Sequence, residues 1–227
     1  MPTPLDLVNT RIQQACDKSG RSPQDVTLVA VSKTWPAEIV ELLVAEGQSI
    51  FGENKLQELE TKAPALAGHL QWHFIGGLQR NKVRKILQHS EVIHSVDSKK
   101  LLDTIDRIAG EESINPSVFF QVNLEGEKSK GGLTPEETEE LVIHAQSLTH
   151  VKLIGLMSIP KFYTNPEDVR PSFRKLRELR DEIVAKTGSP LPSLSMGMSH
   201  DYEVAVEEGA THIRVGSALF GSRNYPT

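Results

Sequence analysis

The stretch LVAVSKTWP, residues 28–36, holds an apolar run that ends in a lysine. Residues 28–31 are all apolar, and a short continuous run of this kind is typical of a strand that is covered on both faces. Lys33 stands just past the end of the run, and Pro36 marks the start of a following helix. A buried strand followed by a helix is the repeating unit of a parallel sheet. The stretch therefore indicates an α/β fold with a lysine at the carboxyl end of its first strand.

The same alternation of a short strand and a helix continues along the chain. We predict eight strands, at residues 27–31, 49–52, 71–75, 92–96, 117–122, 152–157, 192–196 and 212–215. Helices are expected to begin near Pro36, Asn54, Gln79, Ser98, Thr134, Pro166 and Ser199, after a leading helix with Leu5, Val8, Ile12 and Ala15 on one face. The helix at 134–149 has the clearest start, because Thr134, Pro135 and Glu137 form the pattern of a capping box with proline in the first turn.

This repetition predicts the overall architecture. About eight strand-and-helix units, with no linker rich in serine or glycine, indicate one domain over residues 1–227 with the fold of a (β/α)8 TIM-type barrel and an extra N-terminal helix. An open doubly wound sheet is the alternative, and it is disfavoured because no GxGxxG motif follows any strand. Only GSALFGSRNYPT follows the eighth strand, so we expect the last helix to be absent or very short.

Composition limits the class of protein. The 227 residues carry a net charge of -5 and include one cysteine, Cys16. One cysteine excludes an internal disulfide, and no group of Cys and His residues has the spacing of a zinc site. The sequence shows no signal peptide and no apolar run near the ~20 residues of a membrane span, so we expect a cytoplasmic protein. The acidic charge argues against nucleic-acid binding, and the basic segment 80–85 is better explained as a solvated helix face.

Polar residues gather at the carboxyl ends of the predicted strands, the face where barrels carry their active sites. Lys33 follows the first strand, and partial desolvation there favours the neutral amine, which can attack an aldehyde. Ser199 is placed to cap a helix after the seventh strand, and Gly216 with Ser217 form a small turn after the eighth. Barrels often bind phosphate at these two loops. The pattern predicts a site for a phosphorylated aldehyde.

Six segments, in order along the chain, resemble one known family. They are AVSKTWP, FGENKLQE, WHFIGGLQRNK, NLEGEKSKGGL, GLMSIP and LSMGMSHDYEVAVEEGATHIRVGSALFG. They are similar to the pyridoxal phosphate homeostasis proteins of the YggS/PROSC type, from about Val26 to Gly221. That family is similar to the N-terminal barrel domain of alanine racemase, and it carries pyridoxal 5'-phosphate (PLP) as a Schiff base on the lysine of its AVSK motif, which is Lys33 here.

The resemblance implies a position for the cofactor. The cofactor-binding residues that it implies are Lys33, Asn54, Ser199, Arg214, Gly216 and Ser217. The last two and Ser199 would surround the phosphate, while Asn54 would lie near the ring and Arg214 opposite the pyridine nitrogen.

The resemblance also concerns Lys130, Gly77 and His200. Lys130, in the glycine-rich loop 125–132, matches a family lysine, although a solvated loop is the simpler account of that segment. The chain departs from the family pattern at Gly77, where proline is more usual, and at His200, where the family often has aspartate.

The expected electrostatics favour a binding protein over an enzyme. PLP is a strong electron sink when its ring nitrogen is protonated beside a carboxylate, and a cationic Arg214 disfavours that proton. Racemases of this fold also use a base from another domain or subunit, and this chain has no residues left for a second domain. We therefore predict a monomeric carrier or reservoir for PLP in intracellular PLP homeostasis, without catalytic residues or a metal, that supplies apo PLP-dependent enzymes.

Two other functions stay open on the sequence alone. A PLP-dependent, racemase-like enzyme acting on small amino acids would need a second acid/base group such as His73, which is better explained as a core histidine. A cofactor-free lyase or aldolase that forms its Schiff base on Lys33 also fits the barrel, and it predicts a colourless protein.

Overall fold

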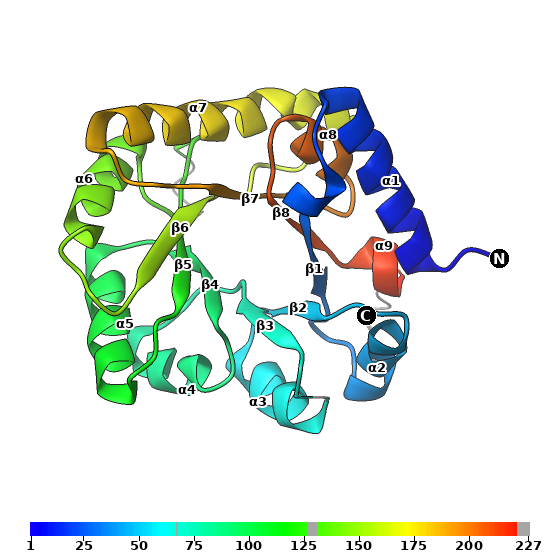
Figure 1. Ribbon diagram of the computed structural model, residues 1–227, viewed down its shortest axis with the longest axis horizontal. Helices are drawn as coiled ribbons and strands as arrows, with labels where there is room; N and C mark the ends of the chain where they lie inside the picture. Colours follow the sequence, from blue (N-terminus) through cyan, green and yellow to red (C-terminus); the bar gives the residue numbers. More distant parts are fainter. Residues whose placement is uncertain (67, 127–130, 222–227) are drawn as a thin grey trace.

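The structure is a computed structural model, and it describes residues 1–66, 68–126 and 131–221. Eight parallel strands form a closed barrel in which each strand pairs with the next and β8 pairs with β1. The helices surround the barrel (Figure 1). The strands are β1 (Thr27–Val31), β2 (Ile50–Glu53), β3 (Gln71–Phe74), β4 (Val92–Val96), β5 (Ser117–Gln121), β6 (Lys152–Met157), β7 (Ser193–Met198) and β8 (His212–Val215). This confirms the predicted TIM-type barrel and excludes the open doubly wound sheet.

The helices follow the strands as the sequence predicts. They are α1 (Pro4–Ser19), α2 (Ala37–Ala45), α3 (Leu56–Ala65), α4 (Val83–Leu87), α5 (Lys99–Glu112), α6 (Pro135–Ala145), α7 (Arg170–Thr187), α8 (Tyr202–Glu207) and α9 (Ser217–Phe220), with short 3-10 turns at Pro23–Asp25, Arg80–Lys82 and Pro166–Val169. The capping box of α6 is confirmed, since Thr134 and Glu137 each accept a hydrogen bond from the backbone N–H of the other. No helix among the described residues is long and apolar enough to cross a membrane.

The extra N-terminal helix, α1, covers the part of the barrel wall beside the short helices α8 and α9. It packs against α8 and α9, beside which it lies in Figure 1. Its buried face is the predicted stripe of Leu5, Val8, Ile12 and Ala15, extended by Cys16. Because α9 has only four residues, α1 supplies the apolar surface that a full final helix supplies in a regular barrel.

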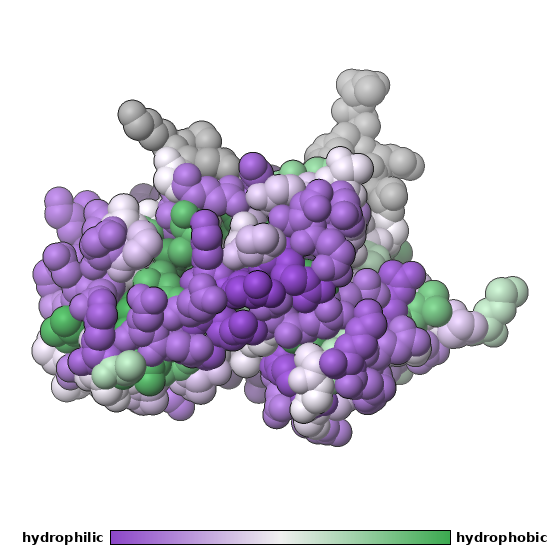
Figure 2. All heavy atoms as spheres, turned by 90° about the horizontal axis from the view of Figure 1, so that it is seen from above, coloured by the Kyte–Doolittle hydropathy of each residue, from purple (hydrophilic) through white to green (hydrophobic). Residues whose placement is uncertain are grey.

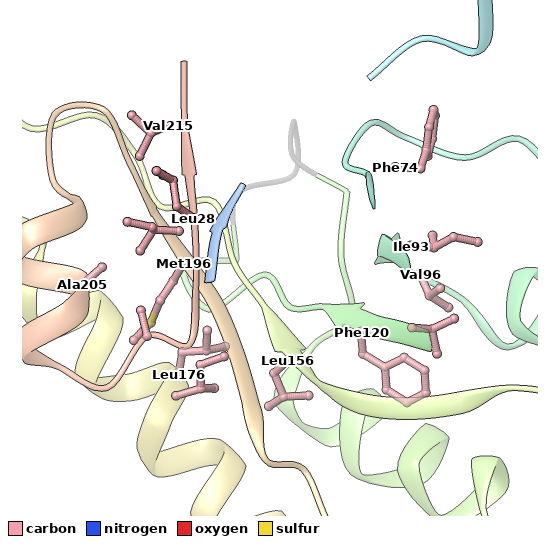
Figure 3. Packing of buried hydrophobic residues seen from close by; sticks show 14 of the residues in the cluster. Leu28, Phe74, Ile93, Val96, Phe120, Leu156, Leu176, Met196, Ala205 and Val215 are labelled. Atoms are coloured by element: carbon pink, nitrogen blue, oxygen red, sulfur yellow. The ribbon is translucent and has the colours of Figure 1, made fainter. Parts of the chain in front are cut away.

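The main hydrophobic core lies between the barrel and its helices. Outward-facing strand residues such as Leu156 and Met196 share one cluster with Leu176 of α7 (Figure 3). The other side of α7 carries charged residues, and the face of the molecule on which it lies is largely hydrophilic (Figure 2). The barrel interior is different: several of its buried residues are polar, and they lead to the candidate site.

Candidate functional site

Lys33 is the second residue of a tight turn that follows β1. The turn spans Ser32 to Trp35 and is closed by a 3.0 Å hydrogen bond from the Trp35 N–H to the Ser32 carbonyl. The Trp35 ring stacks on Phe220 of α9 with 6.0 Å between ring centroids. The turn after the first strand is thereby packed against the helix that follows the last strand. Lys33 itself is half-buried at this mouth of the barrel.

The loops after β7 and β8 meet through Ser199. Its Oγ accepts hydrogen bonds from the backbone N–H of Gly216 (3.0 Å) and of Ala218 (3.3 Å). Ser217, between them, is exposed and opens α9. A hydroxyl oxygen has two lone pairs and one proton, so with both lone pairs used Ser199 still has its proton to donate to an anion.

The expected role of Ser199 as a helix cap is wrong. Helix α8 begins at Tyr202, and its N-cap is Asp201. The carboxylate of Asp201 accepts the Met198 N–H at 2.7 Å. Just before this point Gly197, inside β7, has a φ of 92° and lies so close to Ala205 that a side chain would clash. The Ser199 hydroxyl contacts the loop after β8 instead of the first turn of α8.

Arg214 is a buried cation below these loops. Its side chain is 5% exposed. Nη1 donates a 2.6 Å hydrogen bond to Ser195 Oγ, and Nη2 donates a 3.0 Å hydrogen bond to the Ser158 carbonyl. Burial lowers the pKa of Arg214 to about 10, and the negative charge of Asp201 opposes that shift. The guanidinium is therefore still charged at neutral pH.

Three histidines lie beside Arg214 inside the barrel. His94 Nδ1 is 2.8 Å from Ser195 Oγ, and His94 Nε2 is 2.9 Å from His73 Nδ1. Burial, with the nearby positive charge of His212, lowers the pKa of His73 to about 3, and burial beside Arg214 lowers the pKa of His212 to about 4. His73 is thus a neutral core histidine, as predicted, and no cluster of metal ligands occurs in the described part of the chain.

Two buried polar atoms at the barrel mouth have no hydrogen-bond partner within the described residues. They are Asn54 Oδ1, just after β2, and Ser158 Oγ, just after β6. The backbones of Asn54 and Gly76 are in close contact, since a Cβ at Gly76 would lie 2.2 Å from the Asn54 carbonyl oxygen. A buried polar group without a partner costs free energy, which a bound ligand with matching groups recovers.

The structure brings the predicted site residues to one end of the barrel, with the exception of Lys130, which lies outside the described residues. The sequence placed Ser158 and Ser195 at the ends of their strands but assigned them no role, and it missed His94, which contacts Ser195. The alternation of His94 with apolar strand neighbours was the available signal, since inward-facing strand positions recur every second residue.

Comparisons with known proteins show which family shares this fold. A family model described as alanine racemase, N-terminal domain, matches residues 5–224. A protein of Aquifex aeolicus named pyridoxal phosphate homeostasis protein is 48% identical over 222 residues, which cover 97% of each chain. PipY of Synechococcus elongatus, solved with PLP bound, superposes with a TM-score of 0.83 at 37% identity, covering 93% of this chain and 100% of that one.

A more distant structure shares the fold alone. An alanine racemase of Clostridium difficile has a TM-score of 0.73 at 16% identity, with 96% of this chain and 60% of the racemase covered. The matched barrel is thus one part of that enzyme but nearly the whole of the proteins compared above. The chain belongs to the alanine racemase N-terminal domain family and, within it, to the pyridoxal phosphate homeostasis proteins.

Proposed function

We propose that this chain binds PLP covalently through Lys33 and acts as a cytoplasmic carrier or reservoir in PLP homeostasis. The observation that carries the proposal is the convergence of three groups at one barrel mouth: the Lys33 turn, the Ser199 hydroxyl with the backbone of Gly216, and the buried cation Arg214. These groups match the aldehyde, the phosphate and the ring nitrogen of PLP. The name of the Aquifex aeolicus relative and the PLP bound to PipY support the same cofactor.

Each part of the cofactor has a suitable partner. The Lys33 amine would hold the aldehyde carbon. Ser199 and Ser217 would donate to the phosphate, with Gly216 in the turn beside it. Asn54 would lie beside the ring, where its buried Oδ1 needs a donor. PLP supplies an aldehyde that condenses reversibly with amines and a ring whose electron-withdrawing power depends on the proton at its nitrogen.

The surroundings of the site favour binding of PLP without catalytic turnover. Arg214 keeps its charge at neutral pH, so it opposes a proton on the neighbouring ring nitrogen. The candidate base His73 is 3% exposed and is hydrogen-bonded to His94 inside the barrel, so it is poorly placed to exchange protons with a substrate. These features support a protein that stores PLP and passes it to apo-enzymes, not a racemase.

Attachment is tested by the visible spectrum of the purified protein before and after borohydride, with peptide mass spectrometry to locate the reduced PLP. We expect the label on Lys33 and its loss in Lys33→Ala. Lys55→Ala is the matched control, because Lys55 is an exposed lysine just after β2. A colourless protein, or a label on another lysine in the wild type, contradicts the assignment.

The role is tested by two assays on one preparation. The first measures solvent deuterium incorporation at the α-carbon of a panel of amino acids, and the second measures PLP transfer to an apo-enzyme. We expect negligible incorporation and measurable transfer. Turnover near the common enzyme value of about 10 per second, lost in Lys33→Ala, would establish the enzyme alternative instead.

A further inference from the structure

A buried lysine that is separate from Lys33 lies between α3 and the barrel. Lys62 is 4% exposed and donates to Glu53 Oε1 (2.7 Å), Glu58 Oε2 (2.9 Å) and the Ser32 carbonyl (2.8 Å). Glu53 ends β2 and is fully buried. Glu58 and Lys62 are four residues apart on α3, so they share one face of that helix. We call Glu53, Glu58 and Lys62 the clamp.

The clamp holds the Lys33 turn on both sides of the lysine. Before Lys33, Ser32 donates its hydroxyl to Glu53 Oε1 at 2.6 Å, and its carbonyl accepts from Lys62. After Lys33, the backbone N–H of Thr34 donates to Glu58 Oε2 at 2.5 Å. Three hydrogen bonds from two other elements thus fix the residues that flank Lys33.

The turn needs this support because its third residue has an unfavourable backbone conformation. Thr34 has a φ of 71°, in the left-handed region. Turns with positive φ at the third position usually place glycine there, and a β-branched residue in this region is rare and strained. Without the bonds at Ser32 and at its own N–H, Thr34 is free to relax to negative φ and to rotate the neighbouring Lys33 away.

We propose that Glu53, Glu58 and Lys62 are positioning residues that hold the Lys33 turn in the conformation that attaches PLP. The proposal rests on the proposed role of Lys33. It explains why a carboxylate and an ammonium group, Glu53 and Lys62, are buried at this point, because replacing a buried ion pair by apolar residues of the same size is often neutral or stabilising. Attachment requires the amine to lie close to the aldehyde carbon, so a small displacement of the turn has a large effect on its rate.

Lys62→Met tests the proposal, since methionine has a similar length and no charge. We expect the rate of PLP attachment to Lys33 to fall by about tenfold or more. Binding of pyridoxine 5'-phosphate, which has the ring and phosphate but no aldehyde, is expected to change little. Lys85→Met is the matched control: it removes an equal charge from a mostly exposed ion pair with Glu60 of α3, away from the turn. Attachment in this control is expected to match the wild type.

A second substitution separates positioning from general stability. Thr34→Gly removes the strain at positive φ, so adding it to Lys62→Met should restore part of the attachment rate. A merely structural role for Lys62 predicts no such rescue, and it predicts that both ligands and the thermal midpoint change together. Because removing one partner of a buried ion pair can prevent folding, Glu58→Gln provides a milder variant. The Glu58 side chain is 20% exposed, and glutamine removes the negative charge while it keeps one oxygen that can accept from Thr34.

The outcomes distinguish this inference from the proposed function. A wild type that carries no PLP on Lys33 overturns the proposed function, and the inference with it. A wild type labelled on Lys33, together with unchanged attachment in Lys62→Met and Glu58→Gln, overturns the inference alone. Equal losses for PLP and pyridoxine 5'-phosphate, or no rescue by Thr34→Gly, also reject a positioning role.

Discussion

Arg214 and Ser195, on the neighbouring strands β8 and β7, are joined by a 2.6 Å hydrogen bond from Nη1 to Oγ. Since arginine only donates, the Ser195 oxygen accepts this bond. Ser195 Oγ also lies 2.8 Å from His94 Nδ1, and His94 Nε2 lies 2.9 Å from His73 Nδ1. The result is a chain of hydrogen bonds that joins one cation to two neutral imidazoles and holds Arg214 from inside the barrel.

Ser195→Ala is expected to destabilise the protein by about 1–3 kcal/mol, because it leaves buried donors and acceptors on Arg214 and His94 without a partner. The free energy of unfolding is measured by urea denaturation. Ser193→Ala is the control, since Ser193 is two residues earlier on β7 and outside this chain of hydrogen bonds. Equal stability of the two variants would show that the chain does not hold Arg214.

The buried histidines predict a loss of stability in acid. Burial lowers the pKa of His73 to about 3 and of His212 to about 4, while an unfolded histidine titrates near 6.5. Below about pH 6.5 the unfolded chain therefore binds protons that the folded protein does not, and the free energy of unfolding falls as the pH is lowered, to about pH 4 for His212 and about pH 3 for His73. Each histidine contributes about 1.4 kcal/mol per pH unit within this window.

His73→Asn should make the pH dependence shallower by the contribution of one histidine. Urea denaturation at pH 7, 6 and 5 measures the slope, and the exposed His69→Asn serves as the control. If the wild type and His73→Asn lose stability in parallel, His73 binds protons equally in the folded and unfolded protein, and the lowered pKa is wrong.

Ser199→Ala is expected to weaken PLP binding through the phosphate. A hydrogen bond to a charged group contributes about 1.5–3 kcal/mol, so the affinity should fall by about tenfold or more. Pyridoxal, which lacks the phosphate, should be little affected. Ser147→Ala, at the opposite end of the barrel before β6, controls for loss of a hydroxyl. Equal losses for PLP and pyridoxal would place the phosphate elsewhere.

Gly76→Ala should disturb the barrel mouth, whereas Gly77→Ala should not. A Cβ at Gly76 would meet the backbone of Asn54 at 2.2–2.8 Å, while a Cβ at Gly77 meets nothing within 4 Å. We expect Gly76→Ala to cost about 1–3 kcal/mol of stability and to lower PLP affinity by displacing Asn54. Thermal unfolding and PLP titration of the two variants measure this. Normal binding by Gly76→Ala would remove Asn54 from the site.

The sequence by itself determined the barrel and the position of its functional end. Apolar runs and capping patterns are local, so strands such as β1 and β4, and the capping box of α6, could be predicted with their correct bounds. Lys33 was recognisable for the same reason, because a strand end is visible in a few consecutive residues.

Only the tertiary structure decided which groups meet. The bond between His94 and Ser195 joins residues 101 positions apart, and it exists because the barrel closes. Glu58 and Lys62 have the spacing of an ordinary pair on a helix surface, and only the packing of α3 against β2 buries Lys62 beside the Lys33 turn. Ser199 had the pattern of a helix cap, but its hydroxyl accepts hydrogen bonds from the loop after β8. Such contacts depend on how distant elements pack, which local sequence patterns do not record.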